Sequence, residues 1–159
     1  MAAPRDASGM SVEEFIGPAL VGEGFWLDGR DEDHGHVWEA AAEGGLPELW
    51  RSPCGRFAVR DLDWGPEQVP SVVAEADGSP VGFYLQGQCW VDPEWRRLGL
   101  ASEMILVASR LAGGSPTCNP DGLGFTEAGH AAHVKAHRLA ARRADASRDT
   151  AAGPRSPGM

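Results

Sequence analysis

The sequence predicts one α/β domain of the α+β kind. Its 159 residues suit a single domain, and a hydrophobic content of 42% is enough for one core. Short apolar runs typical of strands fill residues 56–91, and longer helical patterns follow them. The 21 glycines and 12 prolines predict short elements joined by much loop.

The N-terminal part is expected to contribute short helices. Residues 1–10 are small and polar, so we expect them to be disordered. Ser11 and Glu14 have the spacing of a capping box, which predicts the start of a short helix. Residues 37–43 predict a second helix, and residues 46–50 a further helical turn after a glycine break.

The middle of the chain is expected to form the sheet. Residues 56–62 and 72–76 are rich in apolar and β-branched side chains and predict two strands. Residues 77–80, Asp-Gly-Ser-Pro, are a strong turn signal. Residues 81–85 and 88–91 are expected to form one bulged strand that leads into a loop.

Two helices are expected in the last third of the chain. Residues 102–111 carry an apolar side and are followed by Gly113-Gly114, which predicts an amphipathic helix. Residues 127–143 are rich in alanine and end in basic side chains, as a helix C-terminus favours. The composition from Ala144 onward predicts a disordered tail over 144–159, so the folded domain is expected to span 11–143.

The most informative segment joins a strand to a helix and predicts an anion site. A loop that opens a helix directs unpaired backbone N–H groups and the positive end of the helix dipole at one point. Such a point suits a pyrophosphate. Gly99 and Ala101 would allow close approach to the backbone, and Arg96 and Arg97 would add positive charge.

This segment resembles the acyl-CoA-binding motif of the GNAT N-acyltransferase superfamily. The family pattern is Arg/Gln-x-x-Gly-x-Gly/Ala after a strand that ends in Val-x-Pro, and here Val91-x-Pro93 precedes Arg96-x-x-Gly99-x-Ala101. The resemblance covers mainly residues 70–112. It implies a mixed, mostly antiparallel sheet with flanking helices, and a C-terminal part either truncated or rebuilt as a helix.

The resemblance further implies transfer of an acetyl group from acetyl-CoA, as co-substrate, directly to an amine. Backbone near Val91 would pair with the pantetheine arm, and Arg96 and Arg97 would contact phosphates. The amides that would hold the pyrophosphate belong to Leu98, Gly99, Leu100, Ala101 and Ser102.

The general acid and base are not evident from the sequence. An amine must lose a proton to attack a thioester, so the reaction needs a base. Family members often use a tyrosine after the fifth strand as the acid, but the only tyrosine here, Tyr84, precedes the motif. Glu75, expected on the strand beside the motif strand, and Cys118 are the candidate catalytic residues.

Two other functions stay open. The missing tyrosine and short C-terminal part favour a catalytically inactive GNAT-like interaction module. His130, His133 and His137 share one face of the last predicted helix, so a metal- or nucleic-acid-contacting accessory protein is the second alternative. The pattern contains no HExxH motif, and a histidine face that packs on the domain is the simpler interpretation.

The charge and the cysteine content limit the kinds of partner that we expect for this protein. The net charge is −9, and residues 1–90 carry 16 acidic and 5 basic side chains, which makes nucleic acid an unlikely partner and suits a cationic amine. Three widely spaced cysteines indicate neither a zinc site nor a disulfide framework. We expect a cytoplasmic protein with no membrane span and no metal, able to form a homodimer.

Overall fold

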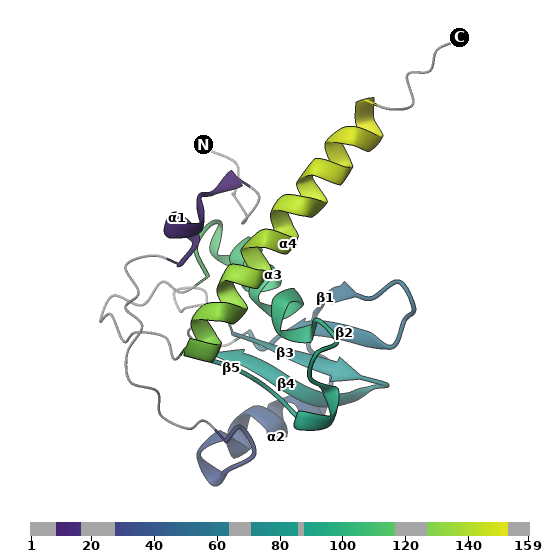
Figure 1. The fold of residues 1–159 in the computed structure, drawn as a ribbon. Helices are drawn as coiled ribbons and strands as arrows, with labels where there is room; N and C mark the ends of the chain where they lie inside the picture. The colour runs from purple at the N-terminus through teal and green to yellow at the C-terminus, as the bar shows by residue number, and fades with distance from the viewer. Residues whose placement is uncertain (1–8, 17–27, 64–70, 86–87, 117–126, 153–159) are drawn as a thin grey trace.

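The chain folds as one antiparallel sheet with helices on both faces. The computed structural model describes residues 9–16, 28–63, 71–85, 88–116 and 127–152. Within them, the expected α+β class is confirmed (Figure 1). The strands are β1 (Glu48–Arg51), β2 (Phe57–Asp61), β3 (Ser71–Ala76), β4 (Ser79–Leu85) and β5 (Gln88–Val91). The helices are α1 (Val12–Ile16), η2 (Glu32–His34), α2 (Gly35–Glu43), η3 (Pro93–Trp95), α3 (Leu100–Ala112) and α4 (Glu127–Ala152).

The strands follow one another across the sheet in the order of the sequence. All four pairings are antiparallel, whereas the resemblance implied a mixed sheet. The predicted turn between β3 and β4 is confirmed: Asp77 and Gly78 have φ angles of 52° and 85°. Two successive residues with positive φ match the right-handed twist of the strands they join.

Two predictions of secondary structure were wrong. Within the segment 46–50, residues 48–50 belong to β1 rather than to a helical turn, because a four-residue strand gains more from pairing with β2 than from one isolated turn. Residues 81–85 and 88–91 form two strands rather than one bulged strand. Leu85 lies opposite Gln88 in an antiparallel register, so the chain reverses direction between them.

The two faces of the sheet have separate apolar cores. Helices α1, α3 and α4 cover one face, with Phe15, Met104 and Ile105 at the centre of the packing. Helix α2 covers part of the other face, where Val37 packs near Phe83 and related side chains. Figure 1 shows α2 on one side of the sheet and α3 and α4 on the opposite side.

Capping signals fix several helix ends as predicted. Ser11 and Glu14 form the expected capping box, in which each side chain accepts a hydrogen bond from the other residue's backbone N–H at 3.1 Å. Gly113 ends α3 in the left-handed conformation with a φ of 72°. Helix α3 begins at Leu100, two positions before the predicted start at Ser102.

Helix α4 continues beyond its predicted end. It was expected to stop near Arg143 and to give way to a disordered tail, but it runs to Ala152. Residues 144–152 contain four alanines, which favour helix more strongly than the polar residues between them oppose it. Residues 1–8 and 153–159, also expected to be disordered, lie outside the described residues.

Candidate anion-binding site

The loop between β5 and α3 has an unusual backbone conformation. After η3, Arg97 has a φ of 66° and Gly99 a φ of 88°. Gly99 stands at the N-cap of α3, and a methyl group at its Cα would meet no atom within 4 Å. Glycine is therefore favoured here by the backbone conformation rather than by lack of space.

This conformation leaves a run of backbone donors available. Among the described residues, none accepts a backbone hydrogen bond from the amides of residues 97–102, and the first such donor in α3 is Glu103, whose N–H reaches the Gly99 carbonyl at 3.1 Å. The N-cap has no side-chain hydrogen bond either. Free amides at the start of a 13-residue helix form a positive site that attracts anions.

Arg96 braces the loop, a role the sequence did not indicate. Its Nε donates to the Val91 carbonyl at 2.6 Å, and its guanidinium lies 5.7 Å from the centre of the Trp90 ring. One carbonyl of the strand end that was expected to pair with pantetheine, that of Val91, is therefore already bonded to Arg96. No described residue holds the side chain of Arg97 in this way, and Arg97 lines the pocket beside the loop.

A pocket of about 270 Å³ opens beside the loop. One wall is the loop and the start of α3, and the other is the first part of α4. The lining residues are Val91, Trp95, Arg96, Arg97, Gly99, Leu100, Ala101, Ser102, Ala128, Ala131, Ala132 and Lys135. Of the eight predicted coenzyme-site residues, all but Leu98 line this pocket, and Leu98 is exposed beside it.

Helix α4 supplies the part of the pocket that the sequence motif could not indicate. Alanines at 128, 131 and 132 leave room between α4 and the loop, and Lys135 adds a positive charge. Glu103 of α3 holds α4 in place by accepting two hydrogen bonds from Arg143, at 2.7 and 2.6 Å. Only the basic composition of the last helix hinted at the role of Lys135.

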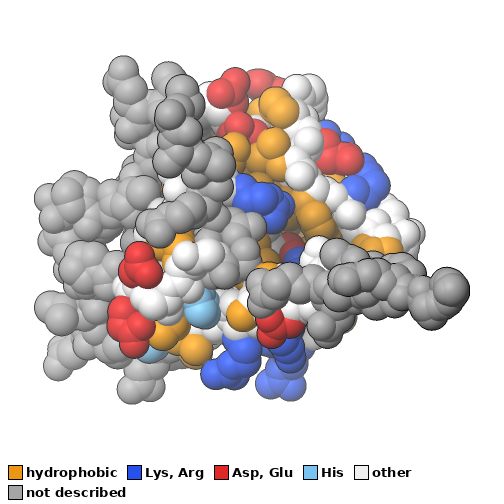
Figure 2. All heavy atoms as spheres, turned by 90° about the horizontal axis from the view of Figure 1, so that it is seen from above, with side chains coloured by type: hydrophobic (Ala, Val, Ile, Leu, Met, Phe, Trp, Pro, Cys, Tyr) orange, Lys and Arg blue, Asp and Glu red, His pale blue; other side chains and the backbone are white. Residues whose placement is uncertain are grey.

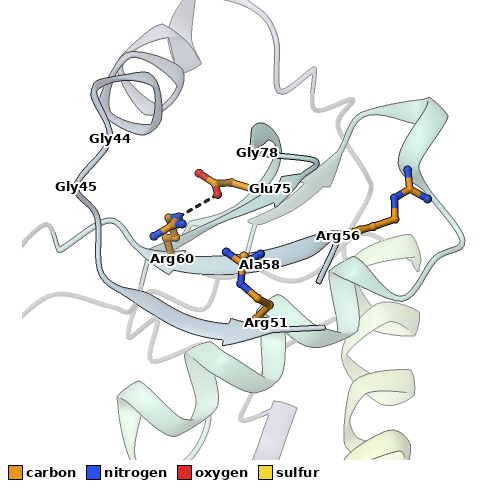
Figure 3. A pocket seen from close by; sticks show the side chains of 8 residues that line it. All are labelled: Gly44, Gly45, Arg51, Arg56, Ala58, Arg60, Glu75 and Gly78. Atoms are coloured by element: carbon orange, nitrogen blue, oxygen red, sulfur yellow. Dashed lines mark hydrogen bonds and ion pairs between the residues drawn. The ribbon is translucent and has the colours of Figure 1, made fainter. Parts of the chain in front are cut away.

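Glu75 does not reach this pocket. It was expected on the strand next to the motif strand, but it lies on β3, and β4 separates β3 from β5. Its side chain also emerges on the α2 side of the sheet, where it accepts a hydrogen bond from Arg60 Nε at 2.9 Å (Figure 3). Cys118, the other catalytic candidate, lies outside the described residues.

The only tyrosine is buried against the last helix. The Tyr84 hydroxyl lies 2.8 Å from His133 Nε2, and neither side chain is exposed. His133 Nδ1 lies 2.7 Å from the Gly129 carbonyl, which can only accept, so Nδ1 carries the proton and Tyr84 donates to Nε2. Burial is the main reason that the pKa of His133 falls to about 4, and the imidazole is neutral at pH 7.

The histidine face of α4 packs on the domain, as the simpler interpretation held. His137 Nε2 donates to the Met10 carbonyl at 2.7 Å, and its ring lies 5.6 Å from that of Phe15. No group of three or more potential metal ligands occurs within residues 9–16, 28–63, 71–85, 88–116 and 127–152. His133 and His137 thus tie α4 to the sheet and to the segment before α1.

On the face seen in Figure 2, the described charged side chains do not gather into one patch of a single sign. In Figure 2, Lys and Arg side chains occupy several separate places, with Asp and Glu side chains nearby. On this face, the described residues form no continuous basic track of the kind that follows a nucleic-acid backbone. Among the described helices, none combines the length and apolarity needed to cross a bilayer.

Comparisons with known proteins leave the site to be interpreted from its own geometry. No family model, curated protein or solved structure matches this chain.

Proposed function

We propose that the protein transfers an acetyl group from acetyl-CoA to an amine. The observation that carries the proposal is that no described residue accepts a backbone hydrogen bond from the amides of residues 97–102, which lie beside a pocket at the N-terminus of α3. A pyrophosphate is suited to such a group of donors. The resemblance of the Val91–Ala101 segment to the GNAT motif supports acetyl-CoA as the ligand.

The pocket offers complementary groups for different parts of the coenzyme. The amides of the loop would hold the pyrophosphate, while Arg97 and Lys135 would neutralise phosphate charge from the two walls. The alanines of α4 would pack against the pantetheine arm as it passes towards β5. β5 is the last strand in the described sheet, so it lies at the edge that the arm would follow.

The proposed chemistry is direct transfer. The amine nitrogen attacks the thioester carbonyl, a C–N bond forms and the C–S bond breaks, and CoA leaves as a thiolate that takes up a proton. The attacking nitrogen loses one proton, so amines that are neutral at the working pH should react fastest. Backbone N–H groups near the carbonyl would stabilise the developing oxyanion.

Calorimetric titration of acetyl-CoA tests the binding step, with Gly99→Ala and Gly78→Ala as a matched pair. Both glycines have φ angles between 85° and 88°, so alanine imposes similar backbone strain at each, but Gly78 belongs to the β3–β4 hairpin. We expect Gly99→Ala to weaken acetyl-CoA binding by at least about tenfold and Gly78→Ala to leave it unchanged. Absence of binding to the unmodified protein, or equal effects of the two variants, would refute the coenzyme site.

A second function, coenzyme binding without transfer, is favoured by the burial of Tyr84. Tyr84 is the only tyrosine of the chain. Its hydroxyl group donates a hydrogen bond to His133 and its side chain has no exposed surface, so it does not face the pocket. Release of free CoA thiol, measured against a panel of primary, aromatic and hydrazine-type amines, separates the two functions. Acceptor-dependent thiol release supports the transferase, and tight binding without it supports the binding module.

A further inference from the structure

A second hollow lies on the opposite face of the sheet from the loop. It occupies the part of the α2 face beside β1, β2 and β3, and its volume is about 260 Å³ (Figure 3). Ala58 forms part of its floor, and glycines form part of its rim. The lining residues are Gly44, Gly45, Arg51, Arg56, Ala58, Arg60, Glu75 and Gly78.

Hydrogen bonds hold the side chains of Arg60 and Glu75 in place, but one polar atom of each makes no hydrogen bond to a described residue. Arg60 donates from Nε to Glu75 Oε1 and from Nη1 to the Leu46 carbonyl, both at 2.9 Å. Its Nη2 has no hydrogen-bond acceptor among the described residues, but it forms a longer ion pair with Glu48 Oε1 at 3.6 Å. Likewise, no described residue donates to Glu75 Oε2.

These two atoms reach solvent through the hollow. In the described part of the chain, no side-chain nitrogen or oxygen that is sealed from water lacks a hydrogen-bond partner. Arg60 Nη2 and Glu75 Oε2 are therefore accessible, although the side chain of Glu75 is only 13% exposed. Since both residues line the hollow, it is the space into which these atoms can bind a ligand.

Arg51 adds a second fixed guanidinium. Its Nη2 donates to Glu48 Oε1 at 2.6 Å and its Nη1 to the Gly55 carbonyl at 2.8 Å. Figure 3 shows the Arg51 guanidinium rising towards the hollow, whereas that of Arg56 points away and is bound by Asp77 through two hydrogen bonds. Positive charge therefore gathers at Arg51 and Arg60, and negative charge at Glu75.

The charges of the hollow are balanced. Arg51 is paired with Glu48, and Arg60 is paired with Glu75 and, at the longer distance of 3.6 Å, with Glu48, so a ligand with net charge would disturb the balance. A ligand with both charges would not: its carboxylate can take the remaining donors of Arg51 and Arg60, and its ammonium group can donate to Glu75 Oε2. We propose that this hollow binds a small zwitterionic amino-carboxylate of the amino-acid kind.

The size of the hollow agrees with this ligand class. Its volume lies below the 300–1,000 Å³ that is roughly typical of pockets for drug-sized molecules, so a ligand of the size of an amino acid fits. The β-sheet separates the hollow from the loop between β5 and α3. The bound amine is therefore not the acetyl acceptor, and the inference is independent of the proposed transferase activity.

Calorimetric titration with simple probes tests the ligand class. Glycine, β-alanine and γ-aminobutyrate vary the distance between the two charges, while acetate and ethylamine each carry only one. We expect at least one zwitterion to bind about tenfold more tightly than acetate or ethylamine. If acetate or inorganic phosphate binds as well as the best zwitterion, the hollow is a simple anion site and the proposal is wrong.

Two variants test the roles of the opposing charges. Glu75→Gln keeps an oxygen for Arg60 but removes the negative charge, so it should weaken the best zwitterion about tenfold without weakening acetate. Arg51→Gln, at a side chain that is 45% exposed and safe for the fold, should weaken both. Cooperative thermal unfolding of each variant serves as the folding control. Undiminished zwitterion binding by either folded variant, or no binding of any zwitterion by the unmodified protein, overturns the proposal.

Discussion

Lowering the pH from 7 to 5 is expected to cost the fold about 2 kcal/mol through His133 alone. In the folded protein, burial lowers the pKa of this imidazole from 6.5 to about 4. In the unfolded chain it returns to about 6.5 and takes up a proton as the pH falls below that value. The contribution to stability is complete above pH 6.5, declines as the pH falls, and stops changing below about pH 4.

Urea denaturation at the two pH values measures this loss, and His133→Gln isolates it. The variant has no imidazole at this position, so its stability should fall by about 2 kcal/mol less than that of the unmodified protein between pH 7 and pH 5. Any effect of the substitution on stability that does not depend on pH cancels in this difference. An equal fall in both proteins would show that His133 is not buried in its neutral form.

Tyr84→Phe separates the effect of burial on the pKa of His133 from the effect of its hydrogen bond to Tyr84. Without the hydroxyl, His133 Nε2 loses the donor at 2.8 Å, so stability should fall by about 1–3 kcal/mol at pH 7. Because burial is the first cause of the lowered pKa of His133, the dependence of stability on pH should persist in this variant. Loss of that dependence would place the cause in the hydrogen bond instead.

Three further substitutions test side-chain packing and one ion pair. Gly29→Ala should cost about 1–3 kcal/mol, because a Cβ atom there would overlap the Trp90 ring. Gly35→Ala should be tolerated, because a Cβ atom at that position would meet no atom within 4 Å. Urea denaturation of both variants checks the contrast. Arg143→Met should cost about 1–3 kcal/mol in the same assay, because Arg143 is 50% exposed but its partner Glu103 is only 11% exposed and would lose both hydrogen bonds. No measurable loss would show that water replaces Arg143 as the donor to Glu103 without cost.

The sequence predicted those elements whose signals are local. The capping box at Ser11, the Asp77-Gly78 turn and the glycine after α3 each act through their own backbone, so a short pattern was enough. The loop before α3 was predicted for the same reason. Position 99 of this loop favours glycine because its φ is 88°, a value that few other residues adopt.

The errors involve pairing between distant residues. Residues 48–51 form a strand only because β2 lies beside them, and nothing in four residues encodes that partner. The reversal between β4 and β5 was missed because two apolar runs separated by a glycine fit both a bulge and a hairpin. The position of Glu75 was wrong as a direct consequence, since one extra strand came between it and the loop.

The candidate site was only half predictable for a similar reason. The residues from Val91 to Ser102 were identified because they are contiguous, and most of them line the pocket. Lys135 and the alanines of α4 are distant from them in the sequence and meet them only in the folded chain. Arg96 was assigned to the phosphates because of its charge, and its bond to the Val91 carbonyl could not be inferred from its position in the motif.

The sequential order of the strands has a consequence for folding kinetics. Each strand can pair with the one made just before it, so the sheet needs only short loop closures, which cost little entropy and favour rapid formation. The contact between Tyr84 and His133 instead joins residues 49 positions apart. Helix α4 is therefore expected to dock after the sheet has formed. Substitutions in the β3–β4 hairpin should slow refolding, whereas Ala136→Gly in α4 should mainly accelerate unfolding.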